Sequence, residues 1–380
     1  MKLLEYQAKE VLSSLGIAVP PGAVARTPDE AAAAYARLGP VAVKAQVPVG
    51  GRGKAGGIKL AQTAEEARAA AQQIIGMDIK GFRVPLVYCE TALDIAREIY
   101  VGFTVDRDAR ANVLLLSAKG GMDIETVAEE SPEAIARLHP NPWRGPLDFE
   151  LNRLAFDAEL GELVRPLSAV IKKLYRAIPD YDALTAEINP LVVTRSGDVI
   201  AGDAKLEIDD NAAWRHRDLE EKYGSVIEGD PYEVEAKKRG LTYVSLDGEI
   251  GIIGNGAGLC MSTLDLVQRA GGRPANFCDI GGGAKAEVVE NALAVILMNP
   301  RVTGVIINVF GGITRGDEVA KGIVTARDNL QMKLPLVVRL SGTNEEEGRA
   351  ILKQHGIEPG VNAWASAQKI VELTRAGART

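Results

Sequence analysis

Long apolar runs, cysteines and basic clusters are scarce in this chain of 380 residues. The longest uninterrupted apolar run, Ala292–Met298, is far shorter than the roughly 18 residues that a membrane span needs. The three cysteines (Cys89, Cys260 and Cys278) are scattered without metal-ligand spacing, which suits buried thiols in a reducing cytoplasm. No basic run stands out and the formal net charge is -7, so neither a membrane nor a nucleic acid is an expected partner.

Histidine is equally rare, and none of the three (His139, His216 and His355) lies in a glycine-rich segment or beside an obvious orienting acid. The chain also has no G-x-S-x-G, S-x-x-K or C-x-x-C motif, so no activated nucleophile can be assigned to it. A group-transfer protein without a nucleophile of its own either transfers the group directly to a bound substrate or uses a nucleophile from another chain.

Glycine, in contrast, is abundant, with 40 residues. The glycines gather in five short segments: 50–57, 251–258, 271–272, 281–283 and 311–316. Glycine at the end of a strand lets the backbone approach a ligand closely, and such turns are common around phosphates. The composition therefore favours a protein that binds phosphate or a nucleotide.

The pattern of predicted strands and helices changes near a charged, helix-prone segment at 214–239. Residues 1–16 predict an amphipathic helix that ends at Gly16, and the rest of the first part mixes strands, turns and helices as an α+β domain does. From residue 248 on, strands and helices alternate with a repeat of about 30 residues, which is the pattern of a doubly wound, flavodoxin-like parallel sheet of about five strands. We therefore expect two domains, 1–238 and 239–380.

The segment Gly50–Gly57 is the densest glycine cluster and connects two predicted strands. It is not a dinucleotide-binding fingerprint, because a strand follows it instead of a helix, and it lacks the Ser or Thr of a Walker loop. Its backbone N–H groups, with Arg52, Lys54 and the nearby Lys44, suit phosphates that are covered during transfer. The alternative is a plain hairpin with a solvated basic tip.

A second hairpin is predicted around the turn at 195–198. If the loop of this hairpin has an odd number of residues, Asn189 is expected opposite Asp203. Glu187 is then expected opposite Lys205, because the residue numbers of both pairs have the same sum. A carboxylate beside an amide oxygen can hold Mg²⁺ when substrate phosphates complete the metal's shell. A surface ladder of polar pairs is the alternative.

Two carboxylates, Glu90 and Glu98, bracket a short segment between two predicted strands. Their oxygens could accept hydrogen bonds from a ribose hydroxyl or an adenine amine. Carboxylates are common on protein surfaces, so simple solvation is the alternative.

Three glycine turns follow consecutive strands of the second domain: Gly254–Gly258, Cys278–Gly283 and Phe310–Arg315. The carboxyl ends of neighbouring parallel strands meet at one edge of a sheet, where helix N-termini attract carboxylates and phosphates. We expect an anionic substrate at this edge, with tight packing as the alternative for individual turns.

Several segments, taken together, are similar to those of a known family. In order, they are Glu5–Lys9 (EYQAK), Gly50–Gly57 (GGRGKAGG), Glu187–Leu191 (EINPL), Asn255–Gly258 (NGAG), Pro274–Phe277 (PANF) followed by Asp279–Gly283 (DIGGG), and Asn308–Ile313 (NVFGGI). Over essentially its whole length the chain resembles the β subunits of succinyl-CoA synthetase, also called succinate–CoA ligase (ADP-forming).

The resemblance implies an ATP-grasp domain followed by a flavodoxin-like CoA-ligase domain. It also implies residues that bind nucleotide (Lys44, Gly51, Arg52, Gly53, Glu90, Leu93 and Glu98), Mg²⁺ (Asn189 and Asp203) and the carboxylate substrate (Asn255, Gly312, Ile313 and Thr314). Glu187 matches the acid that steadies a phosphohistidine loop. Leu93 replaces a small or hydroxyl residue, so its contact would run through the backbone. Pro20 is similar to the ADP-using members, and GTP/GDP stays open beside ATP/ADP.

The family reaction converts succinyl-CoA, phosphate and a nucleoside diphosphate into succinate, CoA and the triphosphate, through succinyl phosphate and a phosphohistidine. In that family the histidine and the CoA site belong to the α subunit, which would account for the missing nucleophile. The expected partners are thus an α subunit, succinate, CoA and phosphate, in an αβ or α₂β₂ assembly. The alternatives are a malate–CoA ligase β subunit, a more distant citrate-handling lyase subunit, a single-chain ATP-grasp ligase and a non-catalytic nucleotide-binding subunit.

Overall fold

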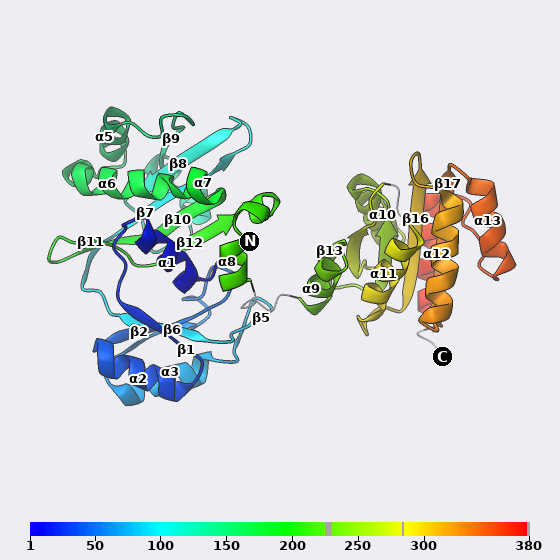
Figure 1. Cartoon of the computed structure of the whole chain (residues 1–380), viewed down its shortest axis with the longest axis horizontal. Helices are drawn as coiled ribbons and strands as arrows, with labels where there is room; N and C mark the ends of the chain where they lie inside the picture. Colours follow the sequence, from blue (N-terminus) through cyan, green and yellow to red (C-terminus); the bar gives the residue numbers. More distant parts are fainter. Residues whose placement is uncertain (225–229, 283–284, 378–380) are drawn as a thin grey trace. The chain divides into compact units, whose positions relative to one another are not determined.

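The computed structural model describes residues 1–224, 230–282 and 285–377. The chain divides into two compact units, Met1–Ile227 and Glu228–Thr380 (Figure 1). Helix α9 (Pro231–Lys238) belongs to the second unit, where the Glu233 side chain accepts a hydrogen bond from the backbone of Ser245 at 2.9 Å. The units therefore divide ahead of the expected residue 238, within the segment 214–239.

The first unit contains an antiparallel sheet with the strand order β1-β6-β2-β3. Its strands are β1 (Gly22–Ala25), β2 (Val41–Ala45), β3 (Ile58–Ala61) and β6 (Val87–Thr91). Helices α2 (Pro28–Leu38) and α3 (Ala64–Ile74) pack their alanines on one face, against Val43 and Cys89. Because side chains alternate along a strand, Lys44 and Glu90 lie on the opposite face.

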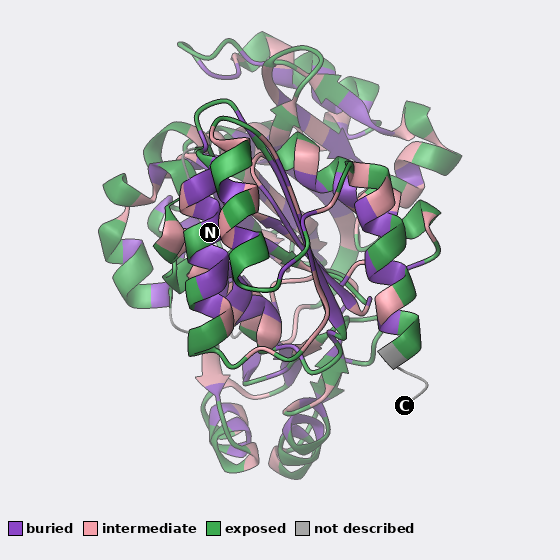
Figure 2. Ribbon diagram, turned by 90° about the vertical axis from the view of Figure 1, so that its right-hand side faces the viewer, coloured by how far each residue is buried: buried purple, intermediate pink, exposed green. Residues whose placement is uncertain are grey.

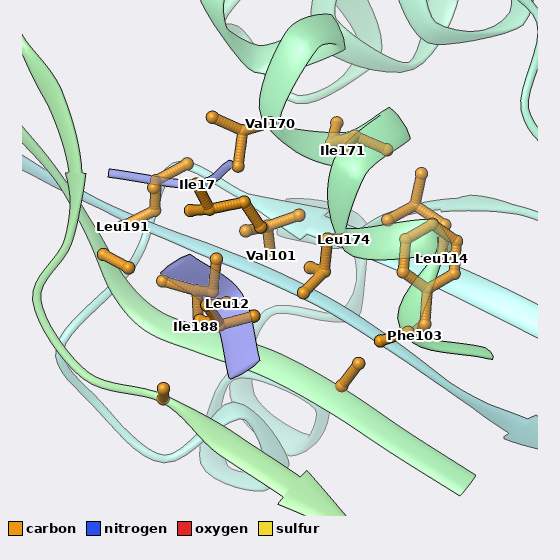
Figure 3. Close-up of a cluster of buried hydrophobic side chains, with 14 of the residues drawn as sticks. Leu12, Ile17, Val101, Phe103, Leu114, Val170, Ile171, Leu174, Ile188 and Leu191 are labelled. Carbon is orange, nitrogen blue, oxygen red and sulfur yellow. The ribbon is translucent and has the colours of Figure 1, made fainter. Parts of the chain in front are cut away.

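The second sheet of this unit is also antiparallel, with the order β11-β10-β7-β8-β9 and with β12 paired to β10. Its strands are β7 (Ile95–Asp106), β8 (Ala111–Ser117), β9 (Ala136–Leu138), β10 (Ala183–Thr194), β11 (Val199–Ala201) and β12 (Lys205–Ile208). Helices α1 (Glu5–Ser14), α5 (Asp148–Asp157), α6 (Val164–Tyr175) and α7 (Ala177–Tyr181) contribute to its core. Figure 3 shows Leu12 and Leu174 of two helices among strand residues such as Val101.

The short elements of the first unit include β4 (Asp78–Ile79), β5 (Phe82–Arg83), α4 (Ile124–Glu130) and α8 (Arg217–Tyr223). The expected helix over 1–16 is wrong at its start, because the residues before Glu5 run extended beside β12. The backbone N–H of Leu3 donates to the carbonyl of Leu206 at 3.0 Å. Its end is confirmed, since Gly16 takes a φ of 81° that residues with a side chain rarely adopt.

The second unit is a five-stranded sheet with the order β13-β15-β14-β16-β17. Its strands are β13 (Thr242–Ser245), β14 (Ile250–Gly254), β15 (Asn276–Asp279), β16 (Gly304–Gly311) and β17 (Leu336–Gly342). The last four are parallel and confirm the doubly wound, flavodoxin-like prediction. The sheet is not parallel throughout, because the edge strand β13 runs antiparallel to β15.

Helices cover both faces of this sheet, which is why its central strands are apolar at nearly every position. They are α10 (Ala257–Arg269), α11 (Ala286–Leu297), α12 (Gly316–Asn329), α13 (Glu345–Gln354) and α14 (Ala363–Gly377). Val267 of α10 and Ile370 of α14 share one core with Ile252, whereas Leu293 of α11 and Ile323 of α12 pack with other strand residues. Figure 2 shows helices whose buried and exposed residues alternate along one ribbon. Within the described ranges, no helix has the length and apolar character needed to cross a bilayer.

Candidate functional site

The glycine loop Gly50–Gly57 connects the antiparallel strands β2 and β3, as the sequence predicts. Its two cations point to different surroundings. The Arg52 side chain is buried, whereas the Lys54 side chain is 76% exposed and pairs with Asp123. Gly51 has a φ of 83°, a conformation that suits glycine in this turn. Only Arg52 therefore joins the interior of the unit.

Buried charges meet where α1, β2 and β6 come together. Glu5 of α1 is the centre of the group: one of its carboxylate oxygens accepts from Lys44 at 2.9 Å and forms an ion pair with Lys9 at the same distance, and the other accepts from Arg52 at 2.6 Å. Arg52 also donates to Asp203 at 2.6 Å. We call Glu5, Lys9, Lys44, Arg52, Glu90 and Asp203 the buried charge cluster.

The two lysines of the cluster share their acceptors. Lys44 donates to Glu90 and to the Gly202 carbonyl, both at 2.6 Å. Lys9 donates to the other oxygen of Glu90 and to the same Gly202 carbonyl, the latter at 2.9 Å. Gly202 lies in the break between β11 and β12, where its carbonyl is free of the strand ladder. With three cations and three carboxylates, the cluster is balanced in charge.

The cluster shifts the pKa values of its members. Burial alone would raise the pKa of Glu5, yet Arg52 and the two lysines hold that pKa well below its ordinary value. Burial alone would lower the pKa of Lys44, but Glu5, Glu90 and Asp203 raise it. For Glu90 burial prevails and raises the pKa, against the pull of Lys44 and Lys9. Lys44 and Arg52 thus stay cationic and desolvated, which is the state that binds phosphate strongly.

The predicted register of the second hairpin is confirmed on both sides of its centre, because Glu187 pairs with Lys205 and Leu191 pairs with Ala201. Between these pairs the ladder is interrupted, and Asn189 and Asp203 lie there at one level of the hairpin. Asn189 is oriented by a neighbouring loop: its amide oxygen accepts from the N–H of Gly121 at 2.8 Å and its amide group donates to Met122 at 2.9 Å. Asp203 is oriented by Arg52.

Asn189 and Asp203 offer oxygen donors of the kind that Mg²⁺ prefers. Among the described residues, no three side chains of His, Cys, Asp or Glu are placed to hold a metal ion together. A metal at this hairpin would therefore need further ligands, as Mg²⁺ does when it binds together with substrate phosphates. The donor set fits that ion.

Glu187 is a partly buried carboxylate on the same hairpin. It accepts from the Tyr100 hydroxyl at 3.4 Å and lies 4.0 Å from the ammonium of Lys205. Burial raises the pKa of the Glu187 carboxyl, against the opposing effect of Lys205. Such a carboxylate keeps an uncommitted acceptor, so it can bind a further donor or a proton.

Leu93 and Glu98 lie near each other in sequence but differ in surroundings. Leu93 is half-buried in the turn between β6 and β7. Glu98 lies on β7, and its carboxylate is beside Gly121, since a Cβ built on that glycine would come within 2.6 Å of it. Glu98 is therefore close to the loop that orients Asn189. Among Glu90, Leu93 and Glu98, the structure brings only Glu90 into the cluster.

Sequence reasoning assigned no role to Glu5 or Lys9. Both lie in the EYQAK segment, and both are buried on α1 at a spacing of four residues. The available signal was their place beside the apolar positions Ala8 and Leu12, because a charge on the buried side of a helix needs a partner.

The second unit gathers Asn255 and the turn after β16. The Asn255 amide oxygen accepts from the backbone N–H of Phe310 at 2.8 Å. Its amide nitrogen donates to the Phe310 carbonyl at 3.0 Å and to the Thr314 hydroxyl at 3.2 Å. The Gly312 carbonyl accepts from Thr343 at 2.9 Å, and the Ile313 side chain is 85% exposed. The turn thus places Asn255, Gly312, Ile313 and Thr314 at the carboxyl edge of the sheet, as predicted. Gly283 of the middle glycine turn lies outside the described residues.

The three histidines have partners away from both groups. His139 bonds Asp106 at 2.8 Å, His216 bonds Asp182 at 2.7 Å, and the ring of His355 bonds the carbonyl of Ile351 at 2.9 Å. All three belong to the described part of the chain, and none contacts the buried charge cluster or Asn255.

Two family models match the chain, an ATP-grasp domain over residues 2–193 and a CoA-ligase domain over residues 253–371. The fold and the two groups of residues therefore define an ATP-grasp CoA ligase. The chain belongs to the family of succinate–CoA ligase β subunits.

Full-length relatives support this assignment. The chain is 52% identical to the GDP-forming succinate–CoA ligase subunit β of Thermus thermophilus, over 98% of this chain and 99% of that protein. It is 49% identical to the ADP-forming subunit β of Rubrobacter xylanophilus, over 99% of this chain and 100% of that protein. An ATP citrate lyase structure from Methanothrix soehngenii has a TM-score of 0.74 at 21% identity, with 99% of both chains covered, and shares the fold.

Proposed function

We propose that the chain binds the nucleotide and helps bind the acid in a succinate–CoA ligase, which interconverts succinyl-CoA, phosphate and ADP with succinate, CoA and ATP. The observation that carries the nucleotide site is the buried charge cluster, whose desolvated Lys44 and Arg52 come from the strand and the glycine loop of an ATP-grasp domain. Desolvated cations aimed at a transferring phosphoryl group stabilise the charge that develops on it.

In this proposal the phosphates bind Lys44, Arg52 and the glycine loop at Gly51 and Gly53. Leu93 and Glu98 complete the nucleotide site at the turn after β6 and on β7. Asn189 and Asp203 hold Mg²⁺, which neutralises phosphate charge when it is bound. Glu90, now paired with both lysines, orients these cations and accepts a bond from the ribose.

The nucleotide choice is proposed from Pro20, which favours ADP over GDP. Pro20 lines a cavity of about 540 Å³ together with Tyr6, Lys9 and Tyr88. A proline side chain offers no hydrogen-bond donor or acceptor to a guanine. Since one relative is named GDP-forming and another ADP-forming, the choice is one of the outcomes of the assay below.

The carboxylate end of the reaction is assigned to the second unit. Asn255, the backbone of Gly312 and Ile313, and the Thr314 hydroxyl present amide, N–H and hydroxyl groups that suit a dicarboxylate. An α subunit supplies the phosphohistidine and the CoA site, because each histidine of this chain is bonded elsewhere. Glu187 accepts a hydrogen bond from the loop that carries this phosphohistidine.

The test is a coupled assay of thioester formation from CoA. The chain is purified alone and together with the α subunit from the same organism, and each sample receives succinate, malate or citrate with ATP or GTP. We expect turnover in the pair alone, with succinate and ATP preferred, and its loss when Mg²⁺ is omitted. Turnover by the pure chain would contradict the need for a partner, and a preference for malate would move the assignment to that ligase.

Asn255→Ala tests the carboxylate end. We expect the succinate KM of the assembled enzyme to rise at least tenfold, since the lost amide removes a hydrogen bond to a charged group, which contributes about 1.5–3 kcal/mol. The affinity for Mg-ATP is expected to stay unchanged, because Asn255 lies in the other unit. Titration and steady-state kinetics measure both quantities.

Asn329→Ala is the matched control, because Asn329 bonds Glu290 at 2.8 Å on an exposed surface of α12. It is expected to leave both parameters unchanged. A fall in nucleotide affinity with an unaltered succinate KM in Asn255→Ala would place the carboxylate elsewhere.

A further inference from the structure

Lys9 has no place in the nucleotide site as proposed, although it is among the most deeply buried charges of the chain. Its side chain is 1% exposed, and although it borders the cavity of Pro20, its ammonium contacts Glu5, Glu90 and the Gly202 carbonyl. It enters the cluster from α1 and is less exposed than Lys44 and Arg52. The aromatic ring of Tyr88 lies beside Lys9, with the ring centroid 5.8 Å from the Lys9 ammonium.

The contacts of Lys9 repeat those of Lys44. Both ammonium groups form ion pairs with Glu5 and with Glu90, and both donate to the carbonyl of Gly202. An ammonium has three donors, so these three acceptors engage Lys44 completely. Binding to a phosphate therefore requires that Lys44 give up at least one of them.

Giving up a buried acceptor is normally unfavourable, since a buried acceptor left without a donor is not compensated for its lost hydration. In this cluster the acceptor keeps a second donor, because Lys9 remains bonded to it. The charge balance has the same consequence. If Lys9 were absent, the three carboxylates Glu5, Glu90 and Asp203 would face two cations, Lys44 and Arg52. The site would then carry a net negative charge toward an incoming phosphate.

We propose that Lys9 is a positioning residue of the nucleotide site: it stays bonded to Glu5, Glu90 and the Gly202 carbonyl, so that Lys44 can exchange them for nucleotide phosphate. The inference rests on the proposed function, in which Lys44 binds that phosphate. It assigns a role to the EYQAK segment that the sequence left without one.

Lys9→Met is the test, in the full chain and in the complex with the α subunit. We expect the Kd for Mg-ATP to rise at least tenfold, and the KM for ATP to rise with it while the KM for succinate stays unchanged. A purely structural role for Lys9 would lower the melting temperature without altering the affinity of the folded protein. Calorimetric titration, thermal melting and steady-state kinetics separate these results.

Lys172→Met is the matched control. Lys172 of α6 pairs with Asp148 at 2.5 Å on the exposed surface, and it does not line the cavity of Pro20. The control removes the same unit charge from the same unit and is expected to bind Mg-ATP as the wild type does. A tenfold loss in Lys172→Met as well would show that net charge, and not the place of Lys9, decides the affinity.

A double variant covers the case in which Lys9→Met does not fold. Lys9→Met with Glu5→Gln restores the balance of buried charge, leaving Lys44 and Arg52 with Glu90 and Asp203. We expect it to fold and to bind Mg-ATP more tightly than Lys9→Met but more weakly than the wild type, because Glu90 and the Gly202 carbonyl still lack their second donor. Wild-type affinity in either folded variant would overturn the proposal.

Different results would refute the proposed nucleotide site and the proposed role of Lys9. If the wild-type chain does not bind Mg-ATP, or if Lys44→Met binds it equally well, the proposed nucleotide site is wrong. If Lys44 is required and folded Lys9→Met still binds like the wild type, the site stands and the role of Lys9 is refuted.

Discussion

Replacing Lys44 with methionine is expected to weaken the binding of Mg-ATP by the full chain about a hundredfold or more. Lys44 combines a permanent charge with burial, and a hydrogen bond to a charged group contributes about 1.5–3 kcal/mol, where 2.8 kcal/mol is a hundredfold in affinity. The variant should still fold, because Lys9 continues to pair with Glu5 and Glu90. Titration calorimetry measures the affinity, and circular dichroism verifies the fold.

The control for this experiment comes from the glycine loop. Lys54→Met removes the same charge from a side chain that is exposed and pairs with Asp123 at the surface. We expect less than a threefold change in affinity, because an exposed ion pair contributes about 1 kcal/mol at most. If both variants lost affinity equally, the phosphates would lie at the tip of the loop instead of at the buried charge cluster.

Glu187→Gln is expected to reduce ligase turnover about 10- to 100-fold, because the charged acceptor for the phosphohistidine loop is lost and a hydrogen bond to a charged group contributes about 1.5–3 kcal/mol. The Kd for Mg-ATP should not change. Burial raises the pKa of the Glu187 carboxyl, so the folded protein prefers its neutral form more than the unfolded chain does. The wild type therefore loses stability as the pH rises from the unfolded pKa through the folded one.

It follows that Glu187→Gln should melt at a higher temperature than the wild type at neutral pH, with the difference vanishing below both pKa values. Assays with the α subunit and thermal melts at several pH values measure the two effects. Glu207→Gln on the neighbouring strand β12 is the control, with no expected loss of turnover. A lower melting temperature together with normal turnover would make Glu187 a structural residue.

The parts of the fold that local patterns determine could be predicted from the sequence. The equal sums of residue numbers predicted that Glu187 lies opposite Lys205, because a hairpin register depends only on the turn and on the two-residue period of a strand. The alternation of strands and helices after residue 248 was equally clear, since each strand of a covered sheet is a short apolar run. The strand β13 escaped this reasoning because its outer residues, such as Val244, face solvent.

The buried charge cluster was only half predictable, because it depends on contacts between distant parts of the chain. Lys44 and Arg52 could be singled out by their place at a glycine loop. Nothing local indicates that Glu5 would meet Arg52 across 47 positions, or that Lys9 would meet Gly202 across 193. The roles of Glu98 and Leu93 stay predictions, since their surroundings in the structure neither require nor exclude a nucleotide.

The loop that orients Asn189 makes one backbone proton unusually informative. The N–H of Gly121 donates to the same amide oxygen that is proposed to bind Mg²⁺. Any ligand that draws electron density from this oxygen, or rotates it, alters the protection and the chemical shift of that single proton. Occupancy of the hairpin can thus be followed by nuclear magnetic resonance or hydrogen exchange at a glycine that lies 68 positions away in the sequence, without a label on the nucleotide.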